Sequence, residues 1–170
     1  MKDAVGSTML VYIVVIVVGI VGSILIASNM YTSAYKAKNN IISEIDRYYM
    51  VNSDTGSNCF SDNTCTTKIE LTLKNMGYHL NNNNLCNDKI FAKVEKKALD
   101  KDTGDVLDYP KTEQVYPDSS NKGYCIYKTS LSNSEYYYTV VTFSHLNINV
   151  LSIGSLFSTP VYGETRTYYN

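Results

Sequence analysis

Apolar and polar residues are separated along this chain rather than mixed. Residues 9–27 form a run of nineteen without a charge, most of them Val, Ile or Leu. As a helix this run is about 28 Å long, close to the roughly 30 Å hydrocarbon core of a bilayer. The pattern predicts a transmembrane helix over residues 7–28, preceded by a short leader or cytoplasmic end at residues 1–6. A cleaved secretory signal and a buried core helix are the alternatives.

The helical pattern continues beyond this run and becomes amphipathic. Apolar residues recur on one face at spacings of three and four, namely Ala34, Ala37, Ile41, Ile45 and Tyr48. Such a stripe is typical of a helix with one buried face. No proline separates it from the apolar run, so we predict one continuous helix from about Ser7 to Met50. Residues 29–50 would pack on a globular domain, and turn-forming residues at 51–58 would end the helix.

From Cys59 onward the alternation of apolar and polar residues predicts strands. The expected strands and hairpins are residues 68–73, a hairpin of 91–99 with 105–109, a second hairpin of 123–129 with 136–143, and further strands in 146–150 and 159–169. Two runs separated by a short turn are typical of a hairpin. The predicted fold class is therefore α+β, with a long N-terminal helix packed on an antiparallel sheet of about five to seven strands. The sheet domain would occupy residues 51–170.

Composition narrows the classes of function. The chain of 170 residues has a net charge of −1, so it lacks the basic excess expected of a nucleic-acid-binding protein. Sixteen tyrosines and four phenylalanines argue against an entirely disordered chain. We expect an ordered domain with no nucleic-acid partner.

Four cysteines, Cys59, Cys65, Cys86 and Cys125, lie in the small strand-rich region. An even number of cysteines in such a domain indicates disulfides and an oxidising compartment. The favoured pairs are Cys59 with Cys65 and Cys86 with Cys125, although four cysteines permit three connectivities. Loop-closure entropy gives about 2.4 kcal/mol for the short loop and about 4 kcal/mol for the long one. The spacings contain no Cys-x2-Cys pair, so zinc is not favoured.

Candidate chemistry is sparse. A Cys/His nucleophile would need a free thiol near His79 or His145. The acidic run at 100–105 contains oxygen ligands of the kind calcium uses, but Lys111 stands where a calcium loop has glutamate, which favours an acidic hairpin turn. The tyrosines at 136–138 fit strand packing better than an exposed binding surface. We expect no enzyme activity, metal, cofactor or small-molecule substrate.

The charges that flank the apolar run and the cysteines that follow it predict opposite orientations in the membrane. Lys36, Lys38 and Arg47 follow the run, and the positive-inside rule alone would place the C-terminal part in the cytoplasm. The cysteines favour the opposite orientation. We expect a single-pass membrane protein whose C-terminal domain lies outside the cytoplasm.

Small residues share one face of the predicted transmembrane helix. Gly19, Ser23 and Ala27 are spaced four residues apart, and Gly22 lies beside them. Such spacing lets two transmembrane helices approach closely. The face predicts packing against another helix; the alternative is that small residues are simply common in such helices.

The layout resembles the type IV pilin superfamily, including pseudopilins and TadE-like minor pilins of tight-adherence systems. The resemblance rests on the polar leader ending at Gly6, the small residue Ser7, the apolar helix that becomes amphipathic, and the cysteine-bearing head. It implies cleavage by a prepilin peptidase after Gly6, and assembly with other pilin-like subunits or membrane assembly proteins through the helix. The family often has glutamate at the fifth mature position, where this chain has Val11.

Together these features predict a membrane-anchored, pilin-like structural protein of a bacterial surface assembly or of a secretion or adhesion system. Its expected partners are the lipid bilayer and related subunits. The alternative is a single-pass surface binding module, adhesin-like or receptor-like, that forms no filament.

Overall fold

The computed structural model describes residues 2–51, 59–60, 63–78, 85–99, 110–117, 123–132, 134–145 and 158–169. These ranges contain the helices α1 (Lys2–Val51), α2 (Asn63–Asn75) and α3 (Asp88–Leu99) and the strands β1 (Lys111–Tyr116), β2 (Tyr124–Ser130), β3 (Glu135–His145), β4 (Ser158–Glu164) and β5 (Tyr168–Tyr169). The predicted α+β class, with a long N-terminal helix on an antiparallel sheet, is confirmed.

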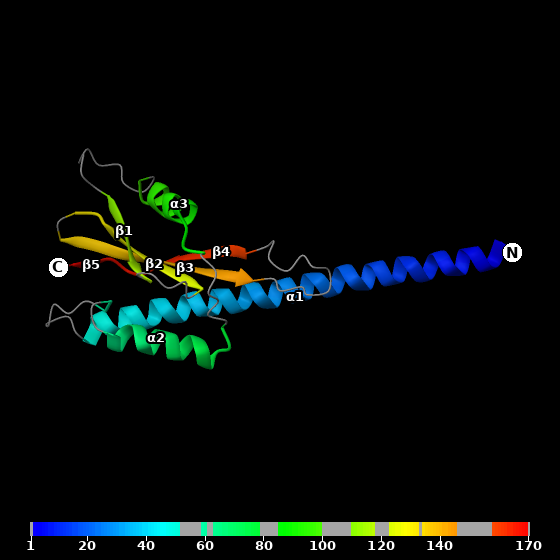
Figure 1. Ribbon diagram of the computed structural model, residues 1–170, viewed down its shortest axis with the longest axis horizontal. Helices are drawn as coiled ribbons and strands as arrows, with labels where there is room; N and C mark the ends of the chain where they lie inside the picture. The colour runs from blue at the N-terminus through cyan, green and yellow to red at the C-terminus, as the bar shows by residue number, and fades with distance from the viewer. Residues whose placement is uncertain are drawn as a thin grey trace.

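The elements form layers around the second half of α1. The first half of α1 projects away from the rest of the molecule and carries the N-terminus at its far end (Figure 1). The second half lies against one face of the sheet, with α2 on its other side, and α3 covers the opposite face of the sheet (Figure 1). The sheet and the helices around it are called the head below.

Helix α1 is continuous over 50 residues, so it is about 75 Å long. The prediction of one unbroken helix is confirmed, with ends a few residues beyond the expected ones. Its predicted buried stripe is confirmed at Ala34, Ala37, Ile41 and Ile45, which are at most 1% exposed, whereas Tyr48 is partly buried.

The sheet is an antiparallel meander in the order β1-β2-β3-β4, and β5 pairs with the N-terminal end of β3. The predicted hairpin of β2 and β3 is confirmed, and the strands expected in 159–169 correspond to β4 and β5. Thr165 bridges those two strands: its N–H donates to the Tyr138 carbonyl at 2.9 Å, and its hydroxyl accepts from the Tyr138 N–H at 3.0 Å. The pair therefore continues one edge of the sheet.

The strand predicted at 68–73 is wrong, since these residues belong to α2. Ile69 and Leu73 are buried while Leu71 is 57% exposed, which is a helical pattern and not an alternating one. Gly77 ends the helix with φ +70°, and the Tyr78 N–H donates to the Leu73 carbonyl in the manner of a Schellman motif. Four-residue spacing from Cys65 through Ile69 to Leu73 was the signal for this helix.

The first strand of the hairpin predicted at 91–99 is also wrong, because these residues form α3. Asn87 caps the helix by accepting from the Ile90 N–H at 3.2 Å. Val94 and Ala98 are buried at helical spacing, and lysines lie in the last turn, where they favour the helix dipole. The expected partner strand at 105–109, the turn at 100–104 and the strand at 146–150 lie outside the described residues.

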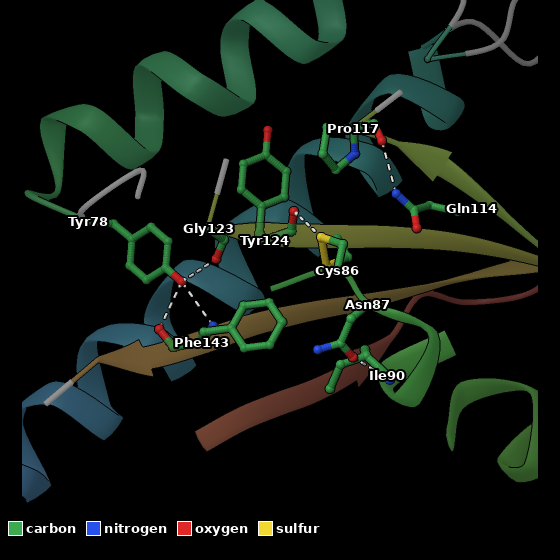
Figure 2. Close-up of a disulfide and its surroundings, with 10 residues drawn as sticks. Tyr78, Cys86, Asn87, Ile90, Gln114, Pro117, Gly123, Tyr124 and Phe143 are labelled. Atoms are coloured by element: carbon green, nitrogen blue, oxygen red, sulfur yellow. Dashed lines mark hydrogen bonds between the residues drawn. A yellow bond between two sulfur atoms is a disulfide. The ribbon is translucent and has the colours of Figure 1, made fainter. Parts of the chain in front are cut away.

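Two disulfides hold the head together. The structure joins Cys59 to Cys65 and Cys86 to Cys125, which are the favoured pairs, with Cα separations of 5.3 and 5.8 Å. The first closes a short loop between α1 and α2. The second fixes the segment before α3 to strand β2, beside Tyr124 (Figure 2).

Tyr78 fastens the end of α2 to the sheet. Its hydroxyl lies 2.7 Å from the Gly123 carbonyl and 3.0 Å from the Phe143 carbonyl, and it accepts from the Phe143 N–H at 3.0 Å (Figure 2). Strand β2 begins at Tyr124, opposite Thr142. The phenol thus supplies a hydrogen-bond partner to β3 at Phe143, one position beyond the pairing of Thr142 with the first residue of β2.

Candidate functional site

The most unusual surface of this chain is the apolar segment of α1, defined here as residues 9–27. Its large side chains are roughly half to two-thirds exposed, for example 68% at Tyr12 and 49% at Ile26. The segment is long and apolar enough to cross a membrane, with mean hydropathy 3.0 in a window of which none is buried. The core-helix alternative is therefore wrong. Exposed apolar surface of this size needs lipid or apolar protein around it.

Within the apolar segment, the small residues make no packing contact with other elements in the described part of the chain. A Cβ added at Gly19 or Gly22 would meet no atom within 4 Å. The Ser23 hydroxyl donates to the Gly19 carbonyl at 2.8 Å, so its polar group is satisfied within the helix. Ala27 lies at the end of the same face. A close neighbour of these residues would have to come from another molecule, and that packing stays a prediction.

The candidate processing residues Gly6 and Ser7 lie in the first turns of α1. The helix runs through both positions without a break. Cleavage after Gly6 stays a prediction.

The junction between the apolar segment and the head lies about two to three turns beyond Ala27. Ala34 is fully buried there, and its carbonyl accepts from the Thr142 hydroxyl at 2.9 Å. Lys38, one turn further, is 9% exposed and passes over Gly163 of β4. These contacts join residues more than a hundred positions apart, so no local signal in the sequence could have shown them.

At the other end of the head, α1 meets a tyrosine cluster made of Tyr49, Tyr136, Tyr138 and Tyr168. Their ring centroids are 4.4–6.3 Å apart. The Tyr49 and Tyr138 hydroxyls are 2.6 Å apart, and the Tyr168 hydroxyl donates to Asp46. Burial, then the hydrogen bond with Tyr49, raises the pKa of Tyr138, so this phenol keeps its proton to higher pH than an exposed tyrosine does.

The run at 136–138 is buried, and the strand-packing interpretation is confirmed. Tyr136 and Tyr138 belong to the core that faces α1, and both are at most 7% exposed. Tyr137, the residue between them, points to the other face of the sheet, as strand alternation requires. It is 7% exposed and packs near Glu164 and Lys97. None of these three tyrosine rings is exposed enough to form a binding surface.

A recess opens between α1 and α2 at the far end of the head. Its volume is about 110 Å³, and it is lined by Glu44, Arg47, Tyr48, Val51, Cys65 and Lys68. Ligand pockets of enzymes and carriers are commonly 300–1,000 Å³, so this recess is small for a substrate site.

All four cysteines are in disulfides, so none offers a thiolate. No group of three or more His, Cys, Asp or Glu gathers in the described part of the chain. His145 ends β3, whereas His79 and the acidic run at 100–105 lie outside the described residues.

No family model, curated protein or solved structure matches this chain. The resemblance to pilins therefore stays a prediction from layout.

Proposed function

We propose that this chain is a membrane-anchored structural protein whose head lies outside the cytoplasm and whose helix packs laterally in a pilin-like or pseudopilin-like assembly. The observation that carries the proposal is the single helix α1. None of the apolar window in its first half is buried by the described part of the chain, while its second half is the central element of the head. A helix built this way ties a folded domain rigidly to whatever surrounds the apolar segment.

Continuity of α1 favours a retained anchor over a cleaved secretory signal. Signal peptides have shorter apolar regions and a small-residue cleavage site before the mature domain begins. Here the helix continues past residue 27 with no break, and its next turns become the core of the head. Cleavage at the end of the apolar segment would leave a head whose central helix starts near its first buried residue, Ala34.

The disulfides support a head on the oxidising side of the membrane. Disulfides persist in extracytoplasmic compartments and are rare where thiol reductants are abundant. Both disulfides lie in the head, and Cys125 is fully buried. Protease protection in intact cells and spheroplasts tests this orientation: digestion of the head from outside supports it, and protection until lysis contradicts it.

Lateral packing through the small-residue face can be tested by crosslinking in native membranes. Ser23→Cys lies on that face, and Val21→Cys lies on the opposite side of the same helix with a 51% exposed side chain. We expect oxidation to link Ser23→Cys protomers to each other or to related subunits, and to leave Val21→Cys monomeric. Equal linking of both, or of neither, contradicts packing through this face.

The second candidate is a single-pass binding module that forms no filament. The observation in its favour is that residues 9–27 contain no acidic side chain, and Val11 stands where pilins often have glutamate. That glutamate pairs with the N-terminus of a neighbouring subunit, so this chain lacks the corresponding charge. A membrane-resident monomer that resists crosslinking in every position of the apolar segment favours the binding module.

Processing gives an independent test of the pilin-like interpretation. N-terminal sequencing of the mature protein is expected to begin at Ser7 if a prepilin peptidase cleaves after Gly6. An intact Met1 excludes this cleavage, although it leaves the membrane anchor itself intact.

A further inference from the structure

Lys38 is the one lysine in the described core of the head. It is 9% exposed, and its ammonium lies 4.0 Å from the centroid of the Tyr35 ring. Within the described ranges no carboxylate or carbonyl pairs with this ammonium. The described part of the chain gives this ammonium a ring contact and no carboxylate, so its charge is available to an anion.

The backbone of β4 makes room for this lysine. A Cβ at Gly163 would lie 2.5 Å from Lys38 Cδ, 2.9 Å from its Cε and 2.8 Å from Ile42 Cδ1. The aliphatic stem of Lys38 therefore fills the space that any other residue at 163 would occupy. The stem is held by the head, and the ammonium is directed back along α1 toward Tyr35, in the direction of the N-terminus.

Two tyrosines place this ammonium relative to a bilayer. Tyr12 and Tyr31 are 68% and 50% exposed and are separated by nineteen residues, or about 28 Å along the helix. Tyrosines are enriched at both interfaces of a membrane, whose hydrocarbon core is about 30 Å thick. With the hydrocarbon ending near Ala27, Tyr31 lies about 6 Å beyond it, within a headgroup layer roughly 5–8 Å deep, and the level of Tyr35 lies about 12 Å beyond it, on the water side of that layer.

Tyr31, Tyr35 and Lys38 also share one face of α1. Their spacings of four and three residues keep them within a narrow sector of the helix. Tyr35 is 47% exposed, so the ring that contacts the ammonium is open on its outer side. Lys36, two residues before Lys38, is exposed and lies on a different face of α1. It therefore serves as a lysine of the same charge for comparison.

We propose that this face is a binding site for the phosphate of an anionic phospholipid. The Lys38 ammonium forms an ion pair with the phosphate, and Tyr31 and Tyr35 contact the headgroup from the same face of α1. The site rests on the membrane-anchored state proposed above. Lipid bound at this site would fix the rotation of the head about the axis of α1, because the stem of the lysine that binds the lipid is packed in the head.

The experiment uses the full chain in nanodiscs of phosphatidylcholine and phosphatidylglycerol in equal parts. Phosphatidylglycerol retained per protomer is counted by native mass spectrometry. We expect Lys38→Met to reduce retention about fivefold, which corresponds to about 1 kcal/mol for a lysine at an anionic surface. Lys36→Met is the matched control and is expected to change retention less, because native mass spectrometry counts lipid that stays bound and not lipid attracted diffusely by an exposed lysine. Met keeps the stem that packs over Gly163, and thermal unfolding of the head verifies that the variant is folded.

Gly163→Ala provides a second variant that keeps the charge and displaces the stem, and it is expected to lower retention in the same direction. Unchanged retention in Lys38→Met, or an equal loss in Lys36→Met, overturns the site. Competition by excess inorganic phosphate shows a site for free phosphate and overturns the lipid assignment. Failure of the wild-type chain to enter nanodiscs refutes the proposed membrane anchor, whereas entry with an unchanged Lys38→Met refutes the lipid site alone.

Discussion

Replacing Tyr78 by phenylalanine is expected to destabilise the head without changing its shape. The substitution removes one hydroxyl that accepts from the buried Phe143 N–H and lies within hydrogen-bonding distance of two carbonyls. Because a hydroxyl has one hydrogen, the change leaves the N–H and one carbonyl without this partner. A buried polar group without a partner costs about 1–3 kcal/mol, so the expected loss for two such groups is about 2–6 kcal/mol. For a head of this size that is a fall in Tm of roughly 10–20 °C.

The measurement is thermal and urea unfolding of the full chain in detergent, followed by near-ultraviolet circular dichroism. That signal reports the packed tyrosines of the head and not the helicity of the apolar segment. Tyr169→Phe is the matched control, because Tyr169 is 72% exposed and the chemical change is identical. Its midpoint is expected to stay at the wild-type value.

A free energy of unfolding for Tyr78→Phe within about 0.5 kcal/mol of the wild-type value would refute the reasoning, since surface substitutions already span that range. It would mean that water or a backbone shift replaces the phenol at little cost. An equal loss in Tyr169→Phe would also refute it, because the effect would then belong to tyrosine loss in general.

The remaining predictions concern pH, the long disulfide and the junction. Burial raises the pKa of Tyr78 and of Tyr127 to about 12, so the folded head keeps protons that the unfolded chain loses above about pH 10. Stability is therefore expected to be independent of these groups below pH 10 and to fall as pH rises toward 12; a urea midpoint that rises over this interval contradicts it. Serine at both Cys86 and Cys125 is expected to cost about 4 kcal/mol, against about 2.4 for the short loop, measured by urea unfolding. A smaller cost than the short-loop variant would show that loop entropy does not govern the head. Gly163→Ala is expected to cost about 1 kcal/mol, at the low end for overpacking, because the displaced atoms belong to flexible side-chain ends; a stabilised variant would be inconsistent with the contact.

The sequence was sufficient for α1 and for the β2–β3 hairpin, because both have strong periodicity over many residues. A helix of fifty residues repeats its pattern often enough to be recognised without a partner. The strands at 68–73 and 91–99 were predicted wrongly because both segments are short. The apolar residues Ile69, Leu71 and Leu73 fit the alternation of a strand. Ile69 and Leu73, together with Cys65, equally fit the four-residue spacing of a helix. The structure decides for the helix, because Leu71 is exposed and the other three are buried. Short apolar runs carry this ambiguity by nature.

The candidate sites divide in the same way. The apolar segment could be predicted because hydrophobicity is a property of local sequence. The junction could not, because Lys38 is polar in any scale and becomes a core residue only where Gly163 crosses it. The Tyr78 contacts likewise depend on where β2 begins relative to β3. Both arrangements require the sheet to be placed on the helix before they can be seen.

The uninterrupted passage of α1 from the apolar segment into the head has a mechanical consequence. No loop or proline lies between the apolar segment and the head to act as a hinge, so the two tilt and rotate together. The end of α1 at Val51 is about 36 Å from Ala27, and a tilt of about 20°, ordinary for a membrane helix, would swing that end sideways by roughly 12 Å. Bilayer thickness and neighbouring helices, which set the tilt, would thereby set the direction in which the head points.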